Sequence, residues 1–285
     1  MKLSEIKSVF FTALQTQYPQ EELQSFFSIL ALNILKMNRL EATLQSELKL
    51  KPNELSLFSE SIERLKNHEP IQYIIGETEF YGLPFKVNQH CLIPRPETEE
   101  LVEWIINDYK NKHAASYTVL DIGTGSGCIA ISLAYHLSSL KVFALDISQE
   151  ALNIASLNAS INKVAVNFIQ RNVLTTTSLP AQFDIIVSNP PYVREREKAA
   201  MKENVLQFEP ESALFVPYKD PLLFYRKISE LALSGLSPGG SLYFEINEYL
   251  SKEMKNMLYD LGYKNVELKQ DIFGKDRMIK AYNHA

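Results

Sequence analysis

Cysteine and histidine are scarce in this sequence of 285 residues, which has two cysteines and five histidines. Cys91 and Cys128 alone cannot build a disulfide framework or a cysteine-based zinc site, because both need more thiols. The histidines are scattered along the chain without the short spacing of metal ligands. The composition therefore argues against a metal centre.

Long apolar runs are also missing, and no segment approaches the length of a membrane span. The first twenty residues, MKLSEIKSVFFTALQTQYPQ, carry Glu5 inside their apolar stretch and lack a small-residue cleavage site. This pattern is typical of an amphipathic helix rather than a signal peptide. We therefore expect a cytoplasmic protein that does not bind membranes.

An excess of basic residues is lacking as well. Lys and Arg total 29 and Asp and Glu total 34, which gives a formal net charge of −5. Proteins dedicated to duplex DNA usually carry a basic excess, so we expect no direct nucleic-acid binding. Apolar residues make up 46% of the chain, enough for a substantial core in one large domain or two modest ones.

Residues 1–68 have a helical pattern without strand signals. Asn53, directly before Glu54, predicts the N-cap of a helix that runs to Asn67. We therefore predict a small helical bundle over residues 1–68. Apolar residues at helical spacing form one face at Leu23, Phe26, Phe27, Leu30 and Ile34.

Residues 69–98 are rich in glycine, proline and aromatic residues. Phe80, Phe85 and Val87 lie in short runs around Gly82 and Pro84, which predicts a β-hairpin with both phenylalanines in its core. We expect this segment to link two domains.

Strand and helix patterns alternate over residues 99–285, with a helix predicted at 150–162. Continuous apolar strands between helices are typical of a parallel sheet covered on both faces. The predicted fold is α/β, a Rossmann-like domain with a mostly parallel sheet and a terminal antiparallel hairpin, preceded by the helical bundle. The predicted strands are 117–121, 141–146, 164–170, 183–188, 241–246, 262–268 and 276–281.

The stretch VLDIGTGSGC, residues 119–128, joins a strand to a helix through a glycine loop. Glycines allow close approach to a ligand, and the helix N-terminus adds free N–H groups. The spacing departs from the dinucleotide fingerprint, because Cys128 stands where the third glycine would be. It resembles the S-adenosylmethionine loop of Rossmann-like methyltransferases; the alternative is a tight turn without a ligand. The predicted cofactor-binding residues here are Asp121, Gly123, Thr124, Gly125, Ser126 and Gly127.

Asp146 ends the next predicted strand, nineteen positions after Gly127. A carboxylate there can accept hydrogen bonds from both hydroxyls of a ribose. The alternative is that it caps the following helix, although Ser148 is the better candidate for that cap. Both features suit NAD as well as S-adenosylmethionine, so they specify only a ribose-bearing ligand.

The stretch Asn189-Pro190-Pro191-Tyr192 ends the strand IIVS, so all three motifs open onto the carboxyl edge of one sheet. The prolines fix the backbone, so that carbonyls of Asn189 and Pro190 face a planar NH₂ group on which the Tyr192 ring stacks. Two acceptors would orient the poor nitrogen nucleophile and favour its developing positive charge. The alternative is a proline-terminated strand with a packing tyrosine.

Asn-Pro-Pro-Tyr marks methyltransferases that act on an amide or exocyclic amino nitrogen, including adenine-N6 enzymes. Several further segments closely resemble the release factor glutamine methyltransferases, and the resemblance covers about residues 65–281. These segments are PIQYIIG at 70–76, FYG at 80–82, LIPRPETE at 92–99, FEP at 208–210, Ala213-Leu214 and Asp276-Arg277.

The resemblance implies methyl transfer from S-adenosylmethionine to the side-chain nitrogen N5 of the glutamine in the Gly-Gly-Gln motif of peptide chain release factors, with S-adenosylhomocysteine as product. It implies that Asn189, Pro190 and Tyr192 are catalytic and, with Pro191 and Arg95, bind the glutamine. It also places Asn189 beside the cofactor.

At three positions the residues leave alternatives open. Asn172 stands where the family often has an acid near the adenine, and we predict a cofactor contact there. Arg95 either flanks the site or pairs with Glu97 or Glu99 in an exposed turn. Glu209 either lines the pocket or caps a turn. In Glu245-Ile246-Asn247 the chain departs from a common Glu-Ile-Gly.

Three hypotheses follow for the function. The first is glutamine methylation of release factors, with the helical domain 1–68 recognising the substrate, 69–98 as the hairpin linker and 99–285 as the methyltransferase domain. The second is adenine-N6 methylation of DNA or RNA, against which the acidic balance counts. The third is a non-catalytic cofactor-binding or ribosome-associated module, against which the intact motifs count.

Overall fold

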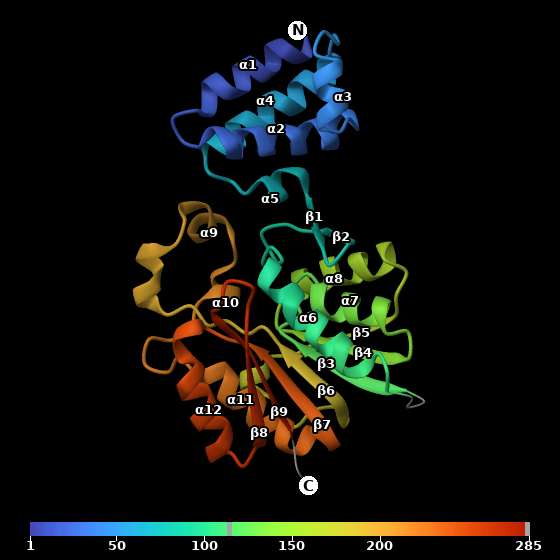
Figure 1. Ribbon diagram of the computed structural model, residues 1–285, viewed down its shortest axis with the longest axis vertical. Helices are drawn as coiled ribbons and strands as arrows, with labels where there is room; N and C mark the ends of the chain where they lie inside the picture. The colour runs from blue at the N-terminus through green and yellow to red at the C-terminus, as the bar shows by residue number, and fades with distance from the viewer. Residues whose placement is uncertain (113–115, 283–285) are drawn as a thin grey trace. The chain divides into compact units, whose positions relative to one another are not determined.

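The computed structural model describes residues 1–112 and 116–282, so His113 and His284 lie outside the described residues. The chain divides into two compact units, which are drawn in Figure 1. One unit consists of residues 1–76 together with 202–208, and the other consists of 77–201 and 209–285. The division falls within the segment 69–98 that we expected to link two domains.

The first unit is helical, as the sequence predicts, and its two longest helices have 16 and 15 residues. Its core is formed by buried faces of these helices, with Phe10, Phe27 and Phe58 in contact. Of the predicted apolar face, Leu23, Phe27 and Leu30 are buried. The helices are α1 (Leu3–Leu14), α2 (Gln20–Leu35), α3 (Arg39–Leu44), α4 (Pro52–Lys66), α5 (Ile71–Ile75) and α9 (Glu203–Phe208).

The predicted cap at Asn53 is wrong, because α4 begins at Pro52, two residues before the start at Glu54 that such a cap implies. Proline suits the first helical position, since its ring presets φ and its missing N–H needs no partner there. Lys51 is the N-cap residue, and its backbone N–H donates to the Glu54 carboxylate at 2.7 Å.

The second unit contains a seven-stranded sheet with the strand order β5-β4-β3-β6-β7-β9-β8. The first five strands of this order are parallel, and β9 pairs antiparallel with both β7 and β8. The sequence prediction of a mostly parallel sheet with a terminal antiparallel hairpin is confirmed. The strands are β3 (Tyr117–Ile122), β4 (Leu140–Asp146), β5 (Val166–Gln170), β6 (Phe183–Ser188), β7 (Leu236–Glu245), β8 (Lys264–Gln270) and β9 (Asp276–Tyr282).

Helices cover both faces of this sheet, which explains why its strands are apolar throughout (Figure 1). One core packs residues of α6, α7 and α8 against the sheet, and a second core packs α11 and α12 against the other face. The helices are α6 (Pro96–Tyr109), α7 (Cys128–His136), α8 (Gln149–Ile161), α10 (Glu211–Leu214), α11 (Leu223–Gly235) and α12 (Ser251–Asp260), with 3₁₀ turns η1 (Val173–Thr175), η2 (Glu195–Ala200) and η3 (Glu248–Leu250).

A separate two-stranded hairpin, β1 (Glu77–Phe80) and β2 (Leu83–Lys86), begins the second unit. Its Phe80 and Phe85 rings are buried in the hairpin core, as the sequence predicts, and they meet edge to face.

Among residues 1–112 and 116–282, no helix has both the length and the apolar character needed to cross a membrane.

Candidate active site

A cavity of about 230 Å³ opens at the carboxyl ends of β3, β4 and β6. Side chains there can meet because parallel strands end at one edge of the sheet. Asp121, Gly127 and Tyr192 do not line the cavity. The predicted residues that line it are Arg95, Gly123, Thr124, Gly125, Ser126, Asp146, Asn172, Asn189, Pro190 and Pro191.

The glycine loop is held against the end of β4 by backbone hydrogen bonds. The Gly123 N–H donates to the Leu145 carbonyl at 2.8 Å, and the Gly125 N–H donates to Asp146 Oδ2 at 2.8 Å. Gly127 has φ +84°, and a Cβ there would lie 2.7 Å from Ile131 Cδ1. Gly127 therefore serves the start of α7 and its packing, whereas Gly123 and Gly125 face the cavity.

Asp121 lies beneath the loop and is fully buried. Its Oδ2 accepts a hydrogen bond from the Thr124 hydroxyl at 2.6 Å. Burial raises the pKa of Asp121 from 3.8 to about 7. The structure thus places Asp121 as a support of the loop, and its contact with a cofactor stays a prediction.

Asp146 is oriented by the backbone on both sides of its carboxylate. Oδ1 accepts from the Ser148 N–H at 3.0 Å, while Oδ2 accepts from Gly125. The predicted cap by Ser148 is confirmed, because its hydroxyl oxygen accepts from the Ala151 N–H at 3.1 Å. A carboxylate has about four acceptor positions, so Asp146 retains capacity for a ribose.

Asn172 lines the cavity and also caps the 3₁₀ turn η1, since its Oδ1 accepts from the Leu174 N–H at 2.9 Å. One acceptor of the side chain is therefore engaged locally. A role beside an adenine stays a prediction.

In the motif at the end of β6, Asn189 lines the cavity, whereas Tyr192 packs against the core. Asn189 is partly buried, and its Nδ2 donates to Thr98 Oγ1 at 3.2 Å. Tyr192 instead packs against a hydrophobic core, and its hydroxyl donates to Glu245 Oε1 at 2.9 Å. Burial and the nearby Glu245 carboxylate raise the pKa of Tyr192, which keeps this hydroxyl protonated. The predicted stacking by its ring stays a prediction.

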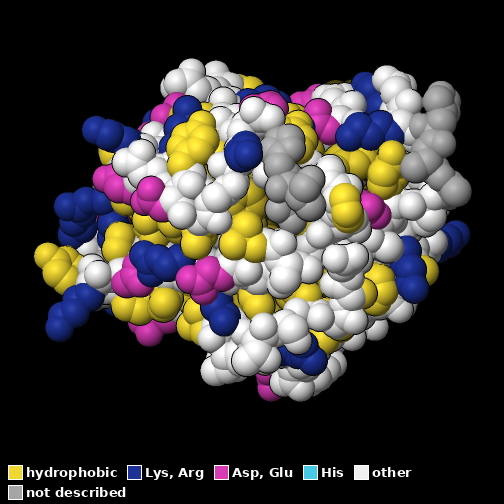
Figure 2. All heavy atoms as spheres, turned by 90° about the horizontal axis from the view of Figure 1, so that it is seen from below, with side chains coloured by type: hydrophobic (Ala, Val, Ile, Leu, Met, Phe, Trp, Pro, Cys, Tyr) yellow, Lys and Arg dark blue, Asp and Glu magenta, His cyan; other side chains and the backbone are white. Residues whose placement is uncertain are grey.

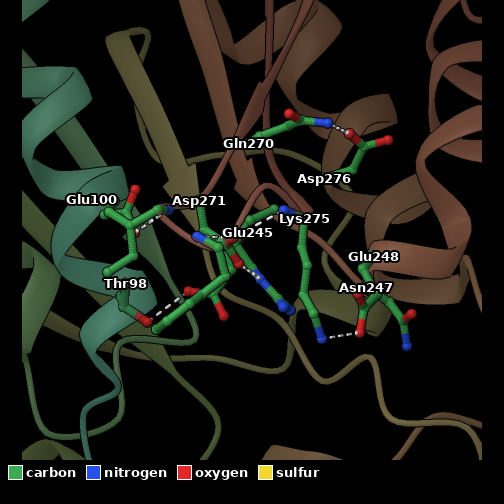
Figure 3. Close-up of polar contacts among 12 residues, drawn as sticks. Thr98, Glu100, Glu245, Asn247, Glu248, Gln270, Asp271, Lys275 and Asp276 are labelled. Carbon is green, nitrogen blue, oxygen red and sulfur yellow. Dashed lines mark hydrogen bonds and ion pairs between the residues drawn. The ribbon is translucent and has the colours of Figure 1, made fainter.

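Thr98 lines the cavity and contacts Glu245, and neither residue was predicted as part of the site from the sequence. The Thr98 hydroxyl donates to Glu245 Oε2 at 2.6 Å, and both side chains are buried, at 2% and 1% exposure (Figure 3). Burial raises the pKa of Glu245, while its hydrogen bonds from Thr98 and Tyr192 act in the opposite direction. Both residues lie in segments that the sequence singles out, RPETE and Glu-Ile-Asn. Their contact could not be predicted, because 147 positions separate the two residues in the sequence.

Of the two alternatives for Arg95, the structure favours a place beside the site, because Arg95 lines the cavity and pairs with Glu209 rather than with Glu97 or Glu99. Its Nη2 lies 2.6 Å from Glu209 Oε1, and the buried Glu209 also accepts from the Ile93 N–H at 3.3 Å. Glu209 itself does not line the cavity; it fixes the loop 93–95 that does. A buried carboxylate needs such a charged partner.

Two sequence families match this chain. Residues 101–210 match the Methyltransferase small domain, and residues 9–76 match the PrmC N-terminal domain. A methyltransferase from Pyrococcus furiosus, known from a crystal structure, covers 82% of this chain and 100% of its own at 19% identity, with a TM-score of 0.53. That likeness shows the fold.

Full-length relatives are closer in sequence. The release factor glutamine methyltransferase of Flavobacterium psychrophilum is 50% identical over 281 residues, which are 98% of this chain and 99% of that protein. The enzyme of the same name from Bacteroides thetaiotaomicron is 45% identical and covers 94% of this chain and 96% of its own. At this identity and coverage, the chain belongs to the release factor glutamine methyltransferase family.

Proposed function

We propose that this protein transfers a methyl group from S-adenosylmethionine to N5 of the glutamine in the Gly-Gly-Gln motif of peptide chain release factors. The observation that carries the proposal is the opening of the glycine loop, Asp146 and the Asn189-Pro190-Pro191 turn onto one cavity. In this arrangement, the residues proposed to bind the nucleoside and those proposed to bind the amide lie around the same space.

The residues around the cavity fit S-adenosylmethionine. The Gly123 and Gly125 backbone is open toward the cavity, with no atom within 4 Å of a Cβ built on either glycine. The Asp146 carboxylate would bind the ribose, and apolar side chains such as Leu174 and Ile147 offer surfaces for a flat base. When bound, S-adenosylmethionine supplies a methyl group already activated on a sulfonium.

The protein's own contribution is to bind and orient the acceptor amide. An amide nitrogen is a poor nucleophile, because its lone pair is delocalised into the carbonyl. Acceptor oxygens of Asn189 and Pro190 would hold its N–H bonds and stabilise the positive charge that develops on nitrogen. Holding the amide in place supplies part of the barrier reduction that well-oriented intramolecular reactions show, about 7–11 kcal/mol at best.

The release factor as substrate fits the remaining features. We place the reaction in the cytoplasm, where release factors work, and assign recognition of the intact factor to the helical unit. On the face drawn in Figure 2, basic, acidic and apolar side chains are intermixed, and the residues described there gather into no basic stripe. Such a face offers little to a nucleic-acid backbone.

The test is labelling with tritiated S-adenosylmethionine of three acceptors: a release factor, its Gly-Gly-Ala variant and duplex DNA. We expect label on the release factor alone, on the glutamine. Label on DNA alone would support adenine-N6 methylation instead and overturn the proposal. No label on any acceptor would support a non-catalytic module.

A further inference from the structure

A continuous set of buried and partly buried hydrogen bonds joins the two ends of the Asn189–Tyr192 motif through residues outside it. Asn189 Nδ2 donates to Thr98 Oγ1 at 3.2 Å, and the Thr98 hydroxyl donates to Glu245 Oε2 at 2.6 Å. The other oxygen of Glu245 accepts from the Tyr192 hydroxyl at 2.9 Å. One carboxylate therefore fixes both polar side chains of the motif.

The chemistry of these groups sets the direction of every bond. The Thr98 hydroxyl gives its single proton to Glu245 Oε2, and a hydroxyl has no second proton to donate. Thr98 Oγ1 then has only lone pairs to offer to Asn189, which must present its NH₂ group. The Asn189 carbonyl oxygen Oδ1 is therefore the end of the amide that remains for the cavity.

Glu245 itself is firmly placed. It is the last residue of β7 and pairs with Met278 of β9, and its backbone carbonyl accepts from the Tyr225 hydroxyl at 3.1 Å. Asn247, two residues on, donates to the Tyr192 carbonyl at 3.2 Å. The last residue of β7 thus holds the Tyr192 hydroxyl, and Asn247 holds the Tyr192 backbone. Figure 3 shows the side chains of Glu245 and Asn247.

We propose that Thr98 and Glu245 are positioning residues, which turn the Asn189 amide so that Oδ1 accepts from the substrate glutamine. This inference rests on the proposed function and extends it to residues outside the motif. An Asn189 amide turned the other way would present NH₂ to the NH₂ group of the glutamine, and two donors cannot bond. The Glu245 carboxylate, which is two hydrogen bonds away from Asn189, therefore determines which orientation the amide adopts.

The main test compares Thr98→Val with Thr98→Ser and with Thr118→Val. Valine keeps the shape of threonine but removes the hydroxyl, whereas serine retains it. Thr118 is a matched control, because its hydroxyl also donates to a carboxylate, Asp184 Oδ2 at 2.9 Å, near the start of β3 and away from the cavity. We expect kcat toward the release factor to fall roughly 10- to 100-fold in Thr98→Val, since misplaced groups cost rates of this order. Thr98→Ser and Thr118→Val should stay within about threefold of the wild type on the same scale.

A binding measurement separates positioning from a merely structural role. Calorimetry on the protein loaded with S-adenosylhomocysteine gives the Kd of a Gly-Gly-Gln peptide and of its Gly-Gly-Ala variant. We expect the wild type to prefer the glutamine peptide and Thr98→Val to lose that preference, with unchanged affinity for S-adenosylhomocysteine. Glu245→Gln should lose it as well, because a carboxamide must donate at one of the two positions where the carboxylate accepts.

The outcomes separate this inference from the function on which it rests. If the wild type labels no release factor, the proposed function fails and the inference falls with it. If the wild type is active but Thr98→Val keeps the glutamine preference and the rate of Thr118→Val, the inference alone is overturned. A parallel loss of S-adenosylhomocysteine affinity and turnover in Thr98→Val would also overturn it, because that pattern indicates a structural defect.

Discussion

Two aspartates at the carboxyl ends of neighbouring strands have different surroundings. Asp121 is sealed beneath the glycine loop and bonded to Thr124, whereas Asp146 faces the cavity and is held by backbone N–H groups. Their positions at the ends of predicted strands indicated that both could bind a cofactor. Burial distinguishes them, and burial is set by packing that no local sequence pattern reveals.

Asp121→Asn should change how stability depends on pH. Because burial raises its pKa from 3.8 to about 7, the folded protein retains a proton that the unfolded chain releases between these values. The contribution of protonated Asp121 to the free energy of unfolding is fully present below about pH 3.8. It is lost as pH rises through about 7, at up to about 1.4 kcal/mol per pH unit. Asparagine still accepts from Thr124 but has no such slope.

Urea unfolding of both proteins at pH 5, 6 and 7 checks this prediction. The free energy of unfolding of the wild type, taken relative to Asp121→Asn, should decrease over this range by roughly 1–3 kcal/mol. A difference that is constant with pH would show that Asp121 is ionised throughout.

Asp146→Asn should weaken the affinity for S-adenosylhomocysteine roughly 10- to 100-fold, the value of hydrogen bonds to a charged group. Glu150→Gln is the matched control, since Glu150 is exposed, does not line the cavity and lies four residues away. Isothermal calorimetry measures both. Equal affinities in the two variants would contradict a role of Asp146 in binding the ribose.

Between elements, the strand-to-helix turn at Gly127 determines how closely α7 approaches α8. A Cβ at this position would lie 2.7 Å from Ile131 Cδ1 and 3.1 Å from Ala155 Cβ, in a backbone conformation with φ +84°. Gly127→Ala should therefore lower the free energy of unfolding by about 2–4 kcal/mol, through strain and overpacking together.

Gly262→Ala serves as the control for backbone strain alone, because Gly262 has φ +96° and nothing lies within 4 Å of its Cβ position. We expect it to cost about 1–2 kcal/mol. Equal losses in the two variants, measured by urea unfolding, would refute the packing argument for Gly127.

The elements themselves were predictable where apolar periodicity and end signals agree, as for β6, α8 with its Ser148 cap, and the pair β8 and β9. The start of β7 was not predictable, because Pro238, Gly239 and Gly240 interrupt the strand pattern. Their strand pairing depends on β6, where the register shifts between Phe183 and Ile185. The Thr98–Glu245 contact was likewise hidden, since tertiary structure alone brings the two residues together.

On the scale of the whole molecule, we expect methyl transfer and recognition of the release factor to belong to different units. Each unit has its own hydrophobic core, and the described cavity is lined by residues of the second unit. The first unit carries no lining residue, which leaves it available to contact the body of a release factor.

Removal of residues 1–76 should accordingly raise KM for an intact release factor roughly tenfold or more while leaving kcat/KM for a short Gly-Gly-Gln peptide near that of the full chain. Binding of S-adenosylhomocysteine provides the check that the shortened protein is folded. An unchanged KM for the intact factor in a folded protein would refute the assignment of recognition to the helical unit.

We propose that the turn after β6 holds a glutamine amide and directs its nitrogen at the methyl donor. A crystal structure with S-adenosylhomocysteine and a Gly-Gly-Gln peptide would show whether it does. We expect the glutamine nitrogen within hydrogen-bond distance of Asn189 Oδ1 and the Pro190 carbonyl, on the side facing the cofactor sulfur. A glutamine bound elsewhere, with Asn189 Oδ1 turned away from it, would refute this role of the turn.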